Sequence, residues 1–256
     1  MTGSAVQSSD GVAVITGGGQ GLGRAFAHAL AGTGRAVAIV DRNGENAAKV
    51  AQEIEAAGGR ACGYAVDVAS EDEVTSAKER IAGDLGTVEI LVNNAAIFST
   101  LEMGPFTDIS PTTWRKVIDV NVTGTFLCCQ AFVPVMVGNG YGKVINISSA
   151  TVFTGRPGYL HYVTSKAAIL GLTRSLASEV GRFGVRVNAI TPGSTETEVE
   201  RATITPAARE RMAADTALRR VQVPEDLVGT VVFLAGKASD FITGQTINVD
   251  GGLAFH

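Results

Sequence analysis

Short apolar runs rich in β-branched residues alternate along the chain with longer stretches whose apolar positions recur at helical spacing. The strand-like runs are Val12–Ile15, Val37–Val40, Gly63–Val66, Glu89–Val92, Lys143–Ile147, Val185–Ile190 and Thr246–Val249. Helical stretches between them include Gly21–Thr33, Glu45–Ala57 and Glu71–Asp84. Continuous apolar strands that alternate with helices predict a parallel sheet covered on both faces. With right-handed crossovers, residues 1–256 are therefore expected to form a single α/β domain, a Rossmann-like doubly wound fold with a seven-stranded parallel sheet.

Six of these runs are followed by a polar or small residue. These residues are Thr16, Asp41, Asp67, Asn93, Ser148 and Thr191. The carboxyl ends of parallel strands lie along one edge of the sheet, and ligands of open α/β sheets bind outside that edge. The longest irregular stretch, about residues 193–222, is long enough to predict a substrate loop or lid rather than a simple connection.

Charge and apolar patterning narrow the classes of partner. The formal net charge is −4 and Lys and Arg form no run, which argues against nucleic acid as a partner. The polar start, Met1–Asp10, lacks the pattern of a signal peptide, and the longest apolar runs are too short to cross a bilayer. We expect a cytoplasmic protein without a membrane partner.

Three cysteines, Cys62, Cys128 and Cys129, fit no metal-ligand spacing and cannot all pair with one another. They are interpreted as small apolar side chains in a reducing compartment. The acidic run at residues 195–200 is interpreted as a solvated, mobile loop, and no metal site is expected.

The segment Thr16–Gly23 is a glycine-rich turn between the first strand and the first helix. Glycines let the backbone approach a diphosphate closely, and the helix N-terminus supplies free N–H groups. The expected cofactor contacts in this turn are Gly17, Gly19, Gln20, Gly21, Leu22 and Gly23.

Asp41, at the end of the second strand, could accept hydrogen bonds from the adenosine ribose and would repel a 2′-phosphate. Arg42 follows it and could instead accommodate NADP. We favour NAD because Asp41 comes first after the strand and because the turn offers Gln20 rather than a basic residue.

Tyr162 and Lys166 are four residues apart in a helix-prone segment, so both side chains lie on one helical face. A free tyrosine titrates near pH ~10, and a nearby ammonium favours its phenolate, as acid–base chemistry near neutrality requires. Ser149 could hydrogen-bond a substrate oxygen. Asn121, within a predicted helix, is either neutral in function or holds a water that links Lys166 to solvent.

From Gly11 to Gly252 the chain resembles the short-chain dehydrogenase/reductase family, in its main branch of ~250 residues. The motifs that carry the resemblance are the Thr16–Gly23 turn, Asp67–Val68, Asn93–Ala96, Asn121, Ser149, Tyr162 with Lys166, Pro192–Gly193 and the segment 242–252. One departure is Ala96, where the family usually has glycine.

The resemblance implies that Tyr162 is the acid–base, that Lys166 lowers its pKa and binds the nicotinamide ribose, and that Ser149 polarises the carbonyl. Asn121 would hold the proton-relay water, Asp67 would meet the adenine amine, and Thr197 would meet the nicotinamide carboxamide. Further cofactor contacts are expected at Val68, Asn94, Ala95, Ala96, Pro192, Gly193 and Thr195. Relatives commonly form tetramers, so a homotetramer is expected.

The predicted activity is an NAD-dependent interconversion of a small or aromatic secondary alcohol and its ketone. The pocket is expected to be mostly apolar and to include Phe98, Ser149, Phe153 and Tyr162. Arg156 is interpreted as a surface residue, with an anion-binding role as its second interpretation. A 3-oxoacyl-[acyl-carrier-protein] reductase using NAD(P)H is the second candidate activity, and a non-catalytic NAD-binding sensor is a more remote one.

Overall fold

The computed structural model describes residues 11–199 and 205–255. Seven parallel strands form one sheet in the order β3-β2-β1-β4-β5-β6-β7. The strands are β1 (Val12–Thr16), β2 (Ala36–Asp41), β3 (Arg60–Ala65), β4 (Val88–Asn93), β5 (Gly142–Ile147), β6 (Val185–Pro192) and β7 (Thr246–Val249). The predicted doubly wound, single-domain fold is confirmed.

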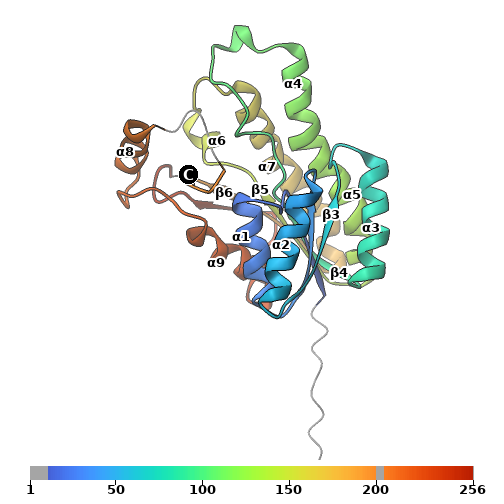
Figure 1. The fold of residues 1–256 in the computed structure, drawn as a ribbon. Coiled ribbons are helices and arrows are strands. Elements are labelled where there is room, and N and C mark those ends of the chain that lie inside the picture. The colour runs from blue at the N-terminus through green and yellow to red at the C-terminus, as the bar shows by residue number, and fades with distance from the viewer. Residues whose placement is uncertain (1–10, 200–204, 256) are drawn as a thin grey trace, which may run out of the picture.

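Helices cover both faces of this sheet. They are α1 (Gly21–Ala31), α2 (Gly44–Ala56), α3 (Glu71–Asp84), α4 (Pro111–Ile118), α5 (Gly124–Gly138), α6 (Thr151–Thr154), α7 (Leu160–Val180), α8 (Pro206–Asp215) and α9 (Glu225–Ala235). One core layer joins the sheet to α1, α2 and α9, and the other joins it to α3, α5 and α7 (Figure 1).

The alternation of side chains along each strand builds these two layers. In β1, Val12 and Val14 belong to the core under α3, α5 and α7, whereas Ala13 and Ile15 belong to the core under α1, α2 and α9. Because successive strand residues point to opposite faces, a strand covered on both sides must be apolar throughout.

The strand order reverses between β1 and β4, which pair directly with each other. Chain connections leave this point in opposite directions, so a crevice opens at the carboxyl ends of the two strands. The site therefore lies where the glycine-rich turn after β1 faces the segment after β4.

A π-helical turn, η2 (Asp119–Thr123), joins α4 to α5. Together they form a helical segment, Pro111–Gly138, that is long and apolar enough to cross a bilayer by length and composition alone. Half of its most apolar window is buried inside the protein, which is the pattern of a core helix. This segment was missed by counting only uninterrupted apolar runs.

The stretch at residues 193–222 is less irregular than predicted, because it contains α8. Thr205 caps that helix by accepting a hydrogen bond from Ala208 N–H, and Pro206 opens its first turn. A parallel bridge between Thr195 and Gln222 joins the two ends of the stretch. Residues 200–204 lie outside the described residues.

Candidate active site

A cleft of about 430 Å³ lies at the carboxyl edge of the sheet. It brings together most of the residues predicted from the strand ends and motifs. These are Gly17, Gln20, Gly21, Leu22, Asp41, Arg42, Asp67, Val68, Asn94, Ala95, Ala96, Phe98, Ser149, Tyr162, Lys166, Pro192, Gly193, Thr195 and Thr197. Gly19, Gly23, Asn121 and Phe153 are not among the lining residues.

The glycine-rich turn is fixed to the neighbouring strand by Asn94. The Asn94 side-chain amide donates to the carbonyls of Thr16 and Gly17, both at 3.0 Å, and its backbone N–H donates to Thr16 Oγ1 at 3.0 Å. Gly17 has a positive φ of 61°, and a Cβ there would lie 2.8 Å from the Cα of Ala95. Only glycine permits this close approach, so the turn keeps its backbone exposed to a ligand.

Gly19 and Gly23 shape the turn rather than line the cleft. A Cβ on Gly23 would collide with the carbonyl oxygen of Gly17, so glycine there lets α1 start against the turn. The backbone N–H of Gly19 donates to Asp41 Oδ2 at 3.0 Å. These positions hold the turn against β2.

Asp41 ends β2 with its carboxylate held in place at both oxygens. Oδ2 accepts from Gly19 N–H, and Oδ1 accepts from Asn43 N–H at 2.9 Å. A negative charge is therefore fixed beside the glycine-rich turn. Arg42 is exposed and lines the same cleft.

The walls of this half of the cleft come from the ends of β3 and β4. Asp67 accepts a hydrogen bond from Ala69 N–H at 2.9 Å, and Val68 is buried. Ala96 is exposed, so its additional methyl group lies at the surface of the cleft rather than inside packed core.

These residues fit a nicotinamide dinucleotide. A backbone turn that only glycine permits sits at the N-terminus of α1, and the positive end of the helix dipole there favours a diphosphate. Asp41 and Asp67 place acceptors for the adenosine end, and Thr195 and Thr197 face the cleft from the other side.

Tyr162 and Lys166 lie on one face of α7, as their spacing predicts. Tyr162 is 7 % exposed, and the ammonium of Lys166 lies 5.8 Å from the centroid of its ring. Lys166 is 3 % exposed, and its Nζ donates to the carbonyl of Ile147 at 2.8 Å. Burial lowers the pKa of Lys166 to about 8, because no carboxylate of the described residues offsets the loss of water around the charge.

Two serines follow β5, and the structure distinguishes them. Ser148 Oγ donates to the backbone carbonyl of Lys166 at 2.7 Å, so it ties β5 to α7. Ser149 Oγ accepts from the backbone N–H of Thr151 at 3.2 Å and from its hydroxyl at 2.9 Å. The Ser149 hydroxyl hydrogen therefore remains available for an oxygen in the cleft.

Asn121 sits in the π-helical turn η2 and is 1 % exposed. Its Oδ1 accepts from Ile97 N–H at 2.8 Å, and its Nδ2 donates to Ser165 Oγ at 3.0 Å. The side chain thus joins the segment after β4 to α7, beside the lysine. A π-helical turn widens the backbone at such positions and is often found at functional sites.

Aromatic rings form the substrate side of the cleft. The Phe98 ring lies 4.5 Å from that of Tyr162 and 5.6 Å from that of Tyr159, centroid to centroid. Phe153, which was expected in the substrate pocket, is not among the residues that line the cleft. From the same segment, Thr151 and Thr154 of α6 line it, as does Arg156 just after that helix.

The acidic run after β6 is solvated at Glu198, which is exposed, but several of its residues are also hydrogen-bonded to other elements. Thr195 is buried and donates to Gln222 Oε1 at 2.9 Å. Glu198 accepts a hydrogen bond from Gly21 N–H, at the start of α1, at 3.0 Å. Glu196 pairs with Arg209 of α8 at 2.6 Å. Glu200 lies outside the described residues.

Sequence reasoning missed Gln222, Tyr159 and Asn146, the buried partner of Asn93. Gln222 Nε2 also donates to the carbonyl of Val249 at 2.7 Å, so it ties the loop to β7. Asn93 Nδ2 donates to Asn146 Oδ1 at 2.9 Å, across the centre of the sheet. For Asn146, the available signal was a polar residue near the end of an apolar strand. No local sequence signal points to Gln222.

Comparisons with known proteins agree with this geometry. The family model described as "Enoyl-(Acyl carrier protein) reductase" matches residues 17–254. The short-chain reductase protein NovJ of Streptomyces niveus is 39 % identical over 251 residues, which are 96 % of this chain and 94 % of that protein.

Two solved structures have similar folds. A gluconate 5-dehydrogenase from Burkholderia cenocepacia, in complex with NADP and tartrate, has a TM-score of 0.90 at 36 % identity and covers 95 % of each chain. A 3-oxoacyl-[acyl-carrier protein] reductase from Brucella melitensis with bound NAD has a TM-score of 0.88 at 34 % identity, covering 98 % of this chain and 93 % of that one.

The chain belongs to the short-chain dehydrogenase/reductase family. It is an oxidoreductase whose cleft and relatives support a nicotinamide dinucleotide as cofactor. Its relatives act on small-molecule substrates.

Proposed function

We propose that the protein interconverts a secondary alcohol and a ketone with NAD, and that Tyr162 is its acid–base. The observation that carries this proposal is the buried ammonium of Lys166 beside the Tyr162 ring, in a cleft that also exposes Ser149. A buried cation without a carboxylate partner is costly, and such costs concentrate at functional sites.

Tyr162, Lys166 and Ser149 have separate roles in alcohol oxidation. NAD bound in the cleft would supply the hydride acceptor. Tyr162 Oη takes the proton of the substrate hydroxyl, and the charge of Lys166 stabilises the phenolate that this requires. Ser149 donates its hydroxyl hydrogen to the substrate oxygen and so fixes its position. In ketone reduction each proton moves in the opposite sense.

Lys166 keeps this charge at neutral pH. Burial lowers its pKa to about 8, which is still above neutrality. The side chain of Asn121 keeps the segment around Ile97 joined to Ser165, one residue before the lysine. Asn121 therefore acts as a positioning residue, through its backbone turn and its side-chain amide.

The preference for NAD follows from Asp41. Its carboxylate is held toward the glycine-rich turn by Gly19 N–H, where it would repel a 2′-phosphate. Arg42, which lines the same cleft, would instead attract a 2′-phosphate and so favour NADP. One solved relative binds NADP and another binds NAD. We expect Asp41→Ser to raise activity with NADP relative to NAD, and Arg42→Gln to lower it.

We further propose a cytoplasmic homotetramer. Phe126 on α5 is 50 % exposed and Phe255 near the C-terminus is 86 % exposed, so both offer apolar surface for contacts between copies. Light scattering tests this assembly, and a mass equal to one chain would contradict it.

The deciding experiment follows nicotinamide absorbance while purified protein is given NAD or NADP with a panel of secondary alcohols. Turnover with NAD that Tyr162→Phe reduces by about 10³-fold would support the proposal. Activity that survives in Tyr162→Phe would refute the acid–base assignment. Preference for NADPH and 3-oxoacyl thioesters would favour the carrier-protein reductase, and cofactor binding without turnover would favour the sensor.

A further inference from the structure

Arg156 lies in the active-site cleft, although its position in the sequence suggested a surface residue. It is half-buried and follows Ser149 by seven residues, in the short connection between α6 and α7. Its guanidinium carbon lies 5.3 Å from the centroid of the Tyr159 ring. Tyr159 in turn packs edge-on against Tyr162, with ring centroids 6.5 Å apart.

The backbone on either side of Arg156 turns at a glycine. Gly155 ends α6 at a φ of 60°, and Gly158 has a φ of 82°, so two left-handed positions flank the Arg156–Pro157 pair. The carbonyl of Gly158 accepts a hydrogen bond from Gly104 N–H at 3.2 Å, which ties this connection to the segment after β4. The connection that carries Arg156 is thus joined to a segment whose residues also line the cleft.

Arg156 differs in its partners from two other partly buried arginines, Arg24 and Arg35. Arg24 forms an ion pair with Glu53, and Arg35 forms one with Glu89. Within residues 11–199 and 205–255, no carboxylate forms an ion pair with Arg156. One face of the planar guanidinium stacks on the Tyr159 ring. The N–H donors along its edge remain available for a ligand.

The charges that line the cleft are separated along its length. Asp41, Arg42 and Asp67 follow β2 and β3, at the end that suits adenosine. Lys166 lies beneath Tyr162. Among the described lining residues, Arg156 is therefore the cation of the substrate side, beside an otherwise aromatic and hydroxyl-bearing wall.

We propose that Arg156 binds a carboxylate of the substrate, so that the protein acts on hydroxy acids and their oxo acids rather than on neutral alcohols. This inference rests on the proposed function. A guanidinium recognises a carboxylate through two parallel hydrogen bonds, and a partly desolvated site strengthens them. The stacking on Tyr159 places the bound carboxylate at a fixed distance from Tyr162, which selects for the position of the hydroxyl along the substrate chain.

The test compares linear hydroxy acids with their methyl esters as paired substrates. The secondary hydroxyl is moved stepwise away from the carboxylate, and kcat/KM is measured with NAD and with NADP. We expect the best acid to exceed its ester by about 10- to 100-fold. Arg156→Gln should remove that difference mainly through KM, and Arg156→Lys should keep only part of it because an ammonium lacks the planar fork.

Arg182→Gln is the matched control, since Arg182 also stacks on an aromatic ring, that of Phe183 at 4.6 Å, but lies outside the cleft. It should leave the acid–ester difference unchanged. Equal kcat/KM for acid and ester in the wild-type protein would overturn the inference while leaving the proposed function intact.

Absence of turnover with every substrate would instead contradict the proposed function. In that case calorimetry with the same acids and esters, in the presence of NAD, decides the inference separately. The inference is supported if an acid binds to the wild-type protein and Arg156→Gln abolishes that binding. It is refuted if the acid binds equally well to Arg156→Gln, or if the ester binds as tightly as the acid.

Discussion

Two buried lysines lie at opposite edges of the sheet, and their surroundings differ. Lys143 near the start of β5 is 1 % exposed, and Lys166 on α7 is 3 % exposed. Lys143 Nζ lies 2.8 Å from a carboxylate oxygen of Asp240 and donates to Ser239 Oγ at 3.0 Å. Among the described residues, Lys166 Nζ instead has the uncharged carbonyl of Ile147 as its hydrogen-bond acceptor.

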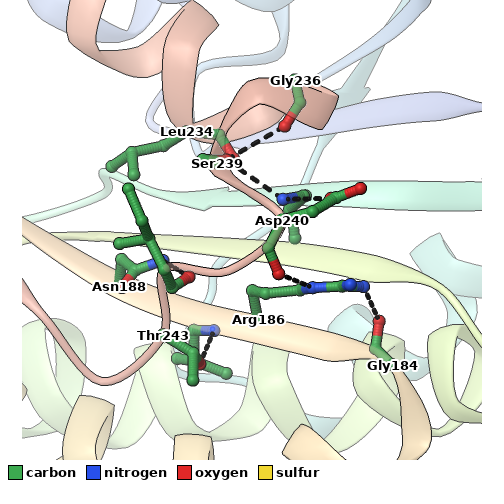
Figure 2. A network of polar contacts seen from close by, with 11 residues as sticks. Gly184, Arg186, Asn188, Leu234, Gly236, Ser239, Asp240 and Thr243 are labelled. Atoms are coloured by element: carbon green, nitrogen blue, oxygen red, sulfur yellow. Dashed lines mark hydrogen bonds and ion pairs between the residues drawn. The ribbon is translucent and has the colours of Figure 1, made fainter.

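Asp240 sits in a larger polar network at the amino edge of the sheet. Figure 2 shows its backbone carbonyl accepting from Arg186 Nε, while Ser239 Oγ lies against the carbonyls of Leu234 and Gly236. Burial lowers the pKa of both lysines, but the carboxylate of Asp240 opposes that shift at Lys143. At the amino edge, the carboxylate of Asp240 neutralises the buried charge of Lys143. At the carboxyl edge, the charge of Lys166 remains available to stabilise the phenolate of Tyr162.

The largest difference should appear in activity. We expect Lys166→Met to lower kcat/KM by about 10²- to 10⁴-fold, because the Tyr162 phenolate loses its stabilising charge. Lys143→Met is the matched control and should change kcat/KM by less than about threefold, since it lies at the other edge. Steady-state kinetics on both variants measure this, and equal losses would show that the two lysines do not differ in function.

A second difference concerns pH. Because the folded-state pKa of Lys166, about 8, is below its ordinary value of 10.5, the unfolded chain binds more protons between these values. The free energy of unfolding of the wild-type protein should therefore rise, relative to Lys166→Met, as pH increases through this window. The full change is roughly 3 kcal/mol. Urea unfolding of both cofactor-free proteins across that range measures it, and parallel curves would contradict it.

The ion pair at the amino edge should respond unequally to loss of its two members. Asp240→Asn leaves the ammonium of Lys143 buried without a counter-charge and should lower the free energy of unfolding by about 2 kcal/mol. Lys143→Met leaves only Asp240, whose side chain is 41 % exposed and stays hydrated, so it should cost about 1 kcal/mol or less. Urea unfolding at neutral pH compares them; a larger loss in Lys143→Met would reverse this interpretation.

An exposed ion pair provides the smallest effect. Asp226 accepts two hydrogen bonds from Arg220, both at 2.6 Å, and these lower its pKa to about 2. Its contribution to stability is present above the ordinary value of 3.8 and is lost as pH falls toward 2. Asp226→Asn should therefore differ little from wild type in thermal unfolding at neutral pH, and this small difference should vanish in acid.

Most of the fold follows from local pattern. Apolar periodicity located all seven strands to within three residues of their ends. The signal is clearest for inner strands such as β1, β4 and β5, which are buried on both faces and must be largely apolar. The stretch at 193–222 was less predictable. Its helix α8 and the Thr195–Gln222 bridge depend on tertiary contacts, and the local sequence pattern does not predict such contacts.

The sequence by itself determined the glycine-rich turn, the polar carboxyl edge and the shared face of Tyr162 and Lys166. Each depends on backbone conformation or helical spacing over a few residues. Tertiary structure alone decided that Lys143 pairs with Asp240, that Glu198 reaches Gly21, and that Arg156 turns into the cleft while Phe153 does not. These contacts depend on how distant segments pack against one another, and the spacing of residues along the chain does not predict that packing.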